Sequence, residues 1–322
     1  MAMESGRGTS RSGFLKQAAG ATMVVAGAGV GAGAIAQSAA AASSIGRVSL
    51  EIDGVNCGAL ARADGGGRAH TVVWDSVGSD HIQRKHVGQP KYEDFTFQVG
   101  SGMGQPMYDW IKASFDQGYV RKSGALIAAD FNYNEKARRS FSDALITEVT
   151  IPALDIRPPL AVGDSCYIIM TCPALTVADV TPSGLPEQAA KQKAWLCSNF
   201  VLEIDGVDTS RVTKIDSFTW KNSTAADGSS VLEVSDIGVT FPRASLPSWK
   251  RWYDSLGSGA DDERNGTLTL VGAQGGAVVT IGLGRLGINE LLPDAPFGTT
   301  SGRVKVEMYC EEVQFEYKAS WA

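Results

Sequence analysis

Three histidines and five cysteines are the side chains of this sequence best suited to ligate a metal ion or to act as nucleophiles. His81 and His86 are five residues apart, which places them on opposite faces of a strand and out of line on a helix. We read them and His70 as solvent-facing loop residues. The cysteines show no C-x-x-C pair and no zinc spacing. Their odd number and wide scatter predict free thiols at Cys57, Cys166, Cys172, Cys197 and Cys310.

A glycine motif, Gly282-Leu-Gly284-Arg-Leu-Gly287, has the formal G-x-G-x-x-G pattern of a dinucleotide-binding loop. That site also needs a helix directly after the loop and an acidic residue on a second parallel strand. Pro293 leaves no room for a helix of useful length. We therefore predict a twisted, glycine-bent strand here, and no cofactor.

Catalytic motifs are missing from the sequence. It contains no G-x-S-x-G, P-loop or H-E-x-x-H pattern. The acidic clusters Asp261–Glu263 and Glu311–Glu312 indicate solvated charge or faces for a partner subunit. No nucleophile, base and orienting group come together. We predict that the protein is not an enzyme and has no catalytic, cofactor-binding or metal-binding residues. The net charge of −6 also argues against a nucleic-acid binder that works through its overall charge.

The strongest signal is an internal repeat. The six residues LEIDGV occur at Leu50–Val55 and again at Leu202–Val207, 152 residues apart. Each copy of the phrase predicts a strand that ends at Asp-Gly, a dipeptide typical of a tight hairpin turn. Further strands follow in both copies, with period-two alternation clearest at Phe95, Phe97 and Val99.

One helix is predicted in each copy of the repeat. The first, in QPMYDWIKASFDQG, has Pro106 in its first turn, and the second, in LPSWKRWYDSLGSG, has Pro247 there. Each carries an apolar stripe that predicts burial against a sheet: Met107, Trp110, Ile111 and Phe115 in the first, and Trp249, Trp252, Tyr253 and Leu256 in the second.

The spacing between matching residues stays nearly constant after the helices. Trp110 and Trp252 are 142 residues apart, and we match Cys172 with Cys310 at a spacing of 138. We predict a mainly β (α+β) protein of two tandem antiparallel β-barrel or sandwich domains, each with one flanking helix. The boundaries are an N-terminal arm at 1–43, domain 1 at 44–180, a polar linker at 181–198 and domain 2 at 199–322.

The N-terminal arm has the pattern of an export leader. Basic residues (Arg7, Arg11 and Lys16) precede a weakly apolar run rich in alanine and glycine. The stretch SRSGFLK resembles the twin-arginine signal, although Ser12 stands where that signal has its second arginine. The arm is either a leader, cleaved or formerly functional, or a disordered extension.

The first copy resembles the tail tube proteins of contractile phage tails and of related injection systems such as type VI systems. The resemblance is carried by three stretches in order: GQPKYEDFTFQVG at 88–100, YDWIKASFDQG at 108–118, and RKSGALIAADFNYNEKARRSFSDALITEVTIPALD at 121–155. It covers roughly residues 48–178. The second copy, roughly 199–318, follows the same plan but lacks the K-Y-x-D wording.

The resemblance implies a structural, self-assembling protein of a phage or phage-tail-like particle. Members of that family place six such domains in a ring and stack the rings into a hollow tube. Two domains per chain would make a trimer with pseudo-sixfold symmetry. Expected partners are further copies of the chain and sheath, baseplate or spike proteins, with DNA or other cargo only as passing contents and no small-molecule substrate. The alternative is an exported tandem β-domain binding module of the cell envelope.

Overall fold

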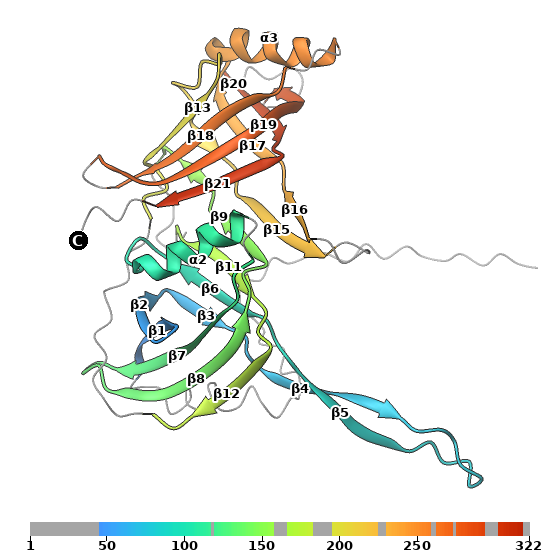
Figure 1. The fold of residues 1–322 in the computed structure, drawn as a ribbon. Helices are drawn as coiled ribbons and strands as arrows, with labels where there is room; N and C mark the ends of the chain where they lie inside the picture. The colour runs from blue at the N-terminus through green and yellow to red at the C-terminus, as the bar shows by residue number, and fades with distance from the viewer. Residues whose placement is uncertain are drawn as a thin grey trace, which may run out of the picture.

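The computed structural model describes residues 45–116, 119–157, 166–182, 195–224, 230–258, 262–272, 275–293 and 302–317. The predicted N-terminal arm at 1–43 lies outside these residues. The described chain is mainly antiparallel β, as the sequence predicts, and it forms two bodies of strands, each with one α-helix (Figure 1).

Repeat 1 contains β1 (Ile45–Ile52), β2 (Val55–Leu60), β3 (Arg62–Asp64), β4 (Arg68–Trp74), β5 (Lys85–Tyr92), β6 (Phe95–Val99), α2 (Gln105–Phe115), β7 (Lys122–Asp130), β8 (Glu135–Ala144), β9 (Glu148–Ile151), β10 (Leu154–Asp155), β11 (Ile168–Cys172) and β12 (Thr176–Val180). Repeat 2 contains β13 (Phe200–Ile204), β14 (Lys214–Ile215), β15 (Phe218–Thr224), β16 (Ser230–Val234), β17 (Ile237–Pro242), a 3₁₀ turn (Arg243–Ser245), α3 (Leu246–Gly257), β18 (Arg264–Val271), β19 (Ala277–Pro293), β20 (Arg303–Tyr309) and β21 (Glu312–Tyr317).

Equivalent contacts recur in the two repeats. The Trp110 indole N–H donates to the Val120 carbonyl at 2.9 Å, and the Trp252 indole N–H donates to the Asp262 carbonyl at 2.8 Å. Trp110 and Trp252 are 142 residues apart, and so are Val120 and Asp262. In the sheets, Ile52 lies opposite Gly124 just as Ile204 lies opposite Gly266. The shared phrase therefore marks the same place in two copies of one fold.

The register corrects the predicted match between Cys172 and Cys310. Phe97 pairs with Met170 in repeat 1, and its equivalent Val239 pairs with Val306 in repeat 2. Met170 and Val306 are 136 residues apart, not 138. The spacing predicted from the two cysteines was wrong because loops of different length separate the strands, so identical residues need not occupy equivalent positions.

The LEIDGV phrase has two different outcomes. In repeat 1 Asp53 and Gly54 both have positive φ, 49° and 81°, and close a two-residue hairpin in which Ile52 pairs with Val55. In repeat 2 the turn is not followed by a strand that pairs with β13, so the predicted hairpin is wrong there. Instead the Asp208 carbonyl accepts a hydrogen bond from the Trp249 indole at 3.1 Å, which ties the chain to α3.

Each helix lies against strands on its apolar side, and the predicted stripe is confirmed for α2. Met107, Trp110, Ile111 and Phe115 are all buried. In α3 only Trp249 and Trp252 are buried, whereas Tyr253 is 38% exposed, so the stripe predicted for the second helix is too wide. The chain between β5 and β6 leaves strand geometry at Glu93–Asp94, and that between β16 and β17 does so at Ser235–Asp236, where a hairpin joins the main sheet.

We predict that Gly124→Ala destabilises the protein by about 1–3 kcal/mol, because a Cβ at this position overlaps the carbonyl oxygen of Glu51 on the neighbouring strand. The control is Gly257→Ala, where an added Cβ meets no atom within 4 Å and the change should be near zero. Thermal unfolding of the full chain measures both variants. Equal unfolding temperatures for the two would contradict the prediction.

Candidate functional site at the junction of the repeats

Backbone pairing joins the two repeats in two sheets, each of which contains strands of both repeats. Strand β9 of repeat 1 pairs antiparallel with β15 of repeat 2, with Val149 opposite Trp220, and β10 pairs with β14, with Leu154 opposite Ile215. The pieces β9 and β10 follow each other along the chain, as do β14 and β15. The six-stranded sheet therefore runs from β3, β6 and β11 through the β9–β15 pair to β16, and the eight-stranded sheet runs from the β10–β14 pair to β17, β20 and β19. Together the two pairs form a seam between the repeats. We call the seam the repeat junction.

Aromatic side chains cover the repeat junction on its core side. Phe115 of α2 meets Trp220 of β15 edge to face, with ring centroids 4.1 Å apart. Tyr108 of α2 stacks on Tyr317 of β21 at 3.6 Å. Burial raises the pKa of Tyr108, whose hydroxyl donates to the Gly100 carbonyl at 2.8 Å. Helix α2 therefore packs on both repeats, which explains why it buries more residues than α3.

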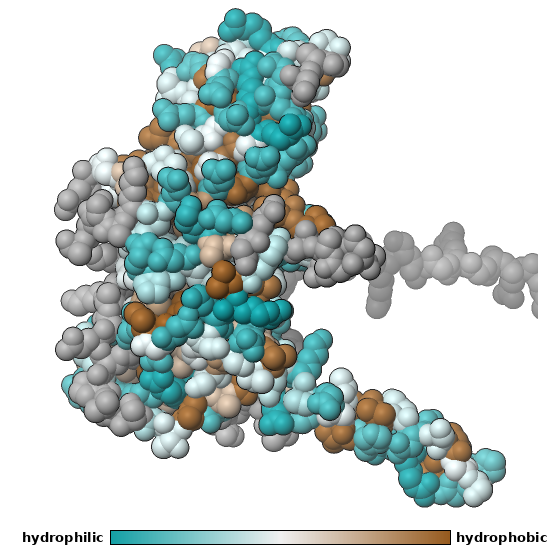
Figure 2. Space-filling view, viewed as in Figure 1, coloured by the Kyte–Doolittle hydropathy of each residue, from teal (hydrophilic) through white to brown (hydrophobic). Residues whose placement is uncertain are grey.

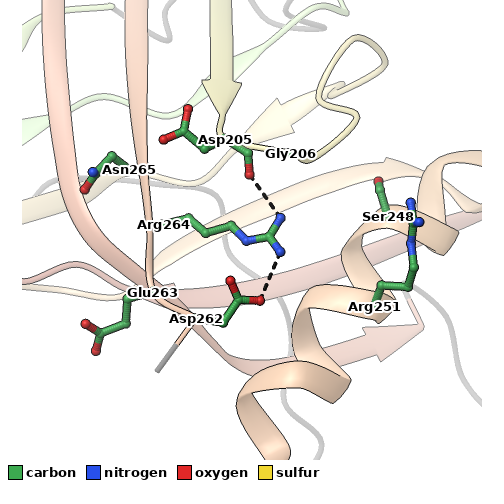
Figure 3. A pocket seen from close by; sticks show the side chains of 8 residues that line it. All are labelled: Asp205, Gly206, Ser248, Arg251, Asp262, Glu263, Arg264 and Asn265. Atoms are coloured by element: carbon green, nitrogen blue, oxygen red, sulfur yellow. Dashed lines mark hydrogen bonds and ion pairs between the residues drawn. The ribbon is translucent and has the colours of Figure 1, made fainter. Parts of the chain in front are cut away.

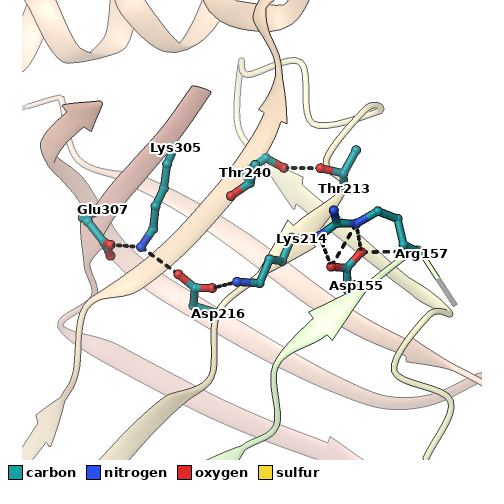
Figure 4. A network of polar contacts seen from close by, with 8 residues as sticks. All are labelled: Asp155, Arg157, Thr213, Lys214, Asp216, Thr240, Lys305 and Glu307. Carbon is teal, nitrogen blue, oxygen red and sulfur yellow. Dashed lines mark hydrogen bonds and ion pairs between the residues drawn. The ribbon is translucent and has the colours of Figure 1, made fainter. Parts of the chain in front are cut away.

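The polar face of the eight-stranded sheet carries a row of ion pairs (Figure 4). Asp216 accepts contacts from Lys214 at 2.5 Å and from Lys305 at 2.8 Å, and Lys305 also reaches Glu307 at 2.5 Å. Burial alone would raise the pKa of Asp216, but hydrogen bonds from the two lysines lower it below its usual range. These charges compensate one another across β14 and β20.

The row of charges continues across the repeat junction. Asp155 of β10 is opposite Lys214 of β14 and binds the Arg157 guanidinium at 2.5 Å. The hydrogen bond from Arg157 and the nearby Lys214 charge lower the pKa of Asp155. Thr213 donates its hydroxyl to the Thr240 carbonyl at 3.1 Å (Figure 4). The polar face is thus built from matched charges and hydroxyl groups.

A disulfide between Cys166 and Cys197 fastens the end of the linker to repeat 1. The sequence prediction of free thiols is wrong for these two residues. Their Cα atoms are 5.7 Å apart, within the range for a disulfide, because the chain folds back and the Trp195 amide donates to the Cys166 carbonyl at 2.8 Å. The thiols of Cys57, Cys172 and Cys310 are free and buried. Burial raises the pKa of Cys57 and of Cys310 to about 11.

A cavity of about 500 Å³ lies beside the Asp-Gly turn of repeat 2 (Figure 3). Its central cation, Arg264, donates to the Asp205 carbonyl and to the Asp262 carboxylate, both at 3.0 Å. The equivalent residue in repeat 1, Lys122, binds Asp53 at 2.6 Å. Both repeats therefore use a basic residue to clamp this turn. The cavity therefore surrounds a contact that holds the turn in place, which is a structural role.

The histidines, the glycine motif and the acidic clusters of the sequence lie at separate places in the structure. The three histidines are exposed, as predicted, but only His81 lies in a loop. His70 lies in β4 and His86 in β5, where it contacts Asp75 at 3.1 Å, so the loop prediction is wrong for these two. The motif Gly282–Gly287 lies within strand β19, so the predicted strand is confirmed. Glu263 and Glu311 both bind Arg285 at 2.6 Å, so they are paired instead of simply solvated. Asp261 lies outside the described residues.

No group of three or more metal-ligating side chains occurs among the residues that the structure describes. Over the same residues, no helix is both long and apolar enough to cross a membrane. The sequence matches no protein-family model, and no curated protein matches it.

The repeat junction is the arrangement that sequence reasoning missed. The spacing of Phe115 predicts only a buried helix face, and nothing in that pattern indicates that its side chain touches Trp220 of the other repeat. One signal was present: ITEVTI at 146–151 resembles INELLP at 288–293, which marks β9 and the end of β19 as equivalent strand segments.

We predict that Trp220→Ala lowers stability by about 3–5 kcal/mol, because it empties a fully packed site at the repeat junction. Since the repeats share strands in two sheets, the wild-type protein should unfold in one calorimetric transition and the variant in two. The matched control is Trp74→Ala on the protruding hairpin, where the side chain is 56% exposed and the transition should stay single. A single unshifted transition in Trp220→Ala would contradict this view of the junction.

We predict that Asp216→Asn lowers the free energy of unfolding by about 0.5–1 kcal/mol at neutral pH, since it removes the acceptor charge between two lysines. The pKa of Asp216 is lowered in the folded protein, so its stabilisation is present above the unfolded pKa of about 4 and is lost as the pH falls through the folded pKa. The difference between wild type and variant, measured by urea unfolding, should shrink below pH 4. A difference that does not change with pH would contradict it.

Proposed function

We propose that this protein is a structural subunit that self-assembles side by side into rings, which stack into a hollow tube of a phage tail or phage-tail-like particle. One observation carries the proposal: two copies of the same fold within the chain already join edge to edge, through β9–β15 and β10–β14. Strand edges are the groups through which sheets extend from one unit to the next. The repeat junction is a working example of such an extension.

The two faces of the joined sheets also suit a tube wall. Burial alternates along β6 and along β20, with side chains such as Phe97 and Val306 buried on one face. The other face carries threonines and the compensated charges of Asp216, Lys305 and Glu307. A hydrated, charge-balanced inner face would let DNA or other cargo pass without binding strongly.

The β4–β5 hairpin supplies a surface for further contacts. It extends away from the body of repeat 1 (Figure 1) and carries exposed apolar side chains, seen as brown surface on the arm in Figure 2. Val72 and Val87 lie opposite each other across the hairpin and are 57% and 69% exposed. Exposed apolar clusters mark contact surfaces. This arm suits contact with the next ring, or with a sheath, baseplate or spike protein.

A second candidate function is an exported tandem β-domain binding module of the cell envelope. The Cys166–Cys197 disulfide supports it, because disulfides persist in oxidising compartments outside the cytoplasm. The leader-like pattern at residues 1–43 agrees with this alternative. Such a module would remain a monomer.

We expect the purified full-length protein, concentrated and viewed by negative-stain electron microscopy, to form rings with six lobes, each ring made of three chains, and stacks of such rings. Light scattering in solution should report a mass of three chains or a multiple of it. A monodisperse monomer at the highest attainable concentration would overturn the proposal and favour the envelope module. Catalytic activity in broad hydrolase screens is not expected.

A further inference from the structure

The end of β19 is an open strand edge where its counterpart in repeat 1 is covered. Residues 287–293 of β19 pair with β20 on one side, whereas β18 and β21 pair only with the earlier part of the strand. Among the described residues no strand lies on the other side of this segment. The equivalent strand, β9, is paired on both sides, by β11 and by β15. The segment Asn289–Leu292 is therefore the open counterpart of Thr147–Thr150.

The β4 strand is the counterpart of β15 and is also open on one side. Arg68 pairs with Tyr92 as Trp220 pairs with Val234. The Glu93 amide donates to the Gly67 carbonyl at 2.8 Å, and the Ser235 amide donates to the Thr219 carbonyl at the same distance. Strand β5 covers one side of β4, and no other described strand pairs with it. One chain thus holds one completed junction and both unpaired halves of another.

We propose that the segment Gly67–His70 of one copy pairs antiparallel with Asn289–Leu292 of a second copy, in the register that β15 and β9 use within the chain. Arg68 then lies opposite Leu291, and Ala69 lies opposite Glu290. This inference rests on the proposed self-assembly and specifies its contact. Because two different surfaces meet, the contact is head to tail, and repeating it gives a closed ring or an open filament.

The proposed contact between chains is more polar than the repeat junction. Arg68 takes the place of Trp220, and Gly257 takes the place of Phe115. The stacked Tyr108 is replaced by Lys250, which pairs with Asp254 at 2.7 Å. Just before β4, Gly65 and Gly66 have φ values of +94° and +73°. The pairing between chains should therefore end before the position that is equivalent to Phe218 in the repeat junction. Rings should therefore dissociate into intact chains before the chains themselves unfold.

Cysteine cross-linking tests the register directly. Within the chain the Asn222 amide donates to the Thr147 carbonyl at 2.7 Å, so the neighbouring pair Lys221 and Glu148 is a non-hydrogen-bonded pair with close side chains. The matching pair between chains is Ala69 and Glu290, both exposed in the single chain. We expect Ala69→Cys protein mixed with Glu290→Cys protein to form a disulfide dimer under mild oxidation. Either variant alone should not, because a head-to-tail contact never brings identical residues together.

Two matched controls make the cross-linking result specific for the proposed register. The double variant Lys221→Cys, Glu148→Cys should close a disulfide within one chain, which shows that this strand geometry cross-links. Ala69→Cys mixed with Leu292→Cys is two residues out of register on the same face and should yield about tenfold less dimer than the matched pair. Equal yields from the two mixtures, or dimers from a single variant alone, would overturn the proposed register.

The outcomes also separate this inference from the proposed function. Rings in the microscope together with cross-links only at other positions would refute the register and leave self-assembly standing. Neither rings nor cross-links at any concentration would refute both. A dimer from the matched pair alone, with a ladder of linked chains from the double variant Ala69→Cys, Glu290→Cys, is the result expected from the head-to-tail contact.

Discussion

The backbone pairing between β9 and β15 is the constraint on which the arrangement of the molecule depends. Strand pairing fixes both the distance and the register of two chain segments, and a slip by one residue would turn every side chain to the opposite face. In this register Trp220 faces the core and meets Phe115 of the helix in the other repeat. The same register brings Asp155 opposite Lys214 on the polar face. The relative placement of the two repeats follows from a handful of hydrogen bonds.

Apolar packing supplies most of the stabilisation around this seam, and the charges supply its selectivity. Exposed ion pairs contribute little because water and salt screen them, whereas the buried aromatic contacts of Tyr108, Phe115 and Trp220 remove large areas from water. The charged row instead disfavours other strand registers. It consists of Lys214, Asp216 and Lys305, and a shifted register would place like charges opposite one another. The core and the polar face therefore have different roles at the repeat junction.

Sequence reasoning recovered what local periodicity encodes. The alternation at Phe95, Phe97 and Val99, the buried stripe of α2 and the strand at Gly282–Gly287 all follow from spacing alone, because a strand or a helix repeats its environment along the chain. The Cys166–Cys197 disulfide and the repeat junction did not follow, because both depend on residues brought together by folding. The hairpin predicted at Asp205-Gly206 is absent for the same reason. The six-residue phrase is identical in the two repeats, but in repeat 2 the Trp249 indole donates a hydrogen bond to the chain that follows it.

The two unpaired edges raise a physical problem that the sequence around them answers. Open strand edges pair indiscriminately unless charge, twist or shortness limits them. Here the edge near β4 begins with the left-handed glycines Gly65 and Gly66 and carries Arg68, and the edge of β19 carries Glu290. Pairing of identical edges would set Arg68 near a second Arg68, or Glu290 near a second Glu290. In the proposed contact Arg68 lies opposite Leu291 and Glu290 lies opposite Ala69, so neither charge meets its like. The same features that keep single chains apart at random encounters thus favour one orientation of contact, in which unlike ends meet.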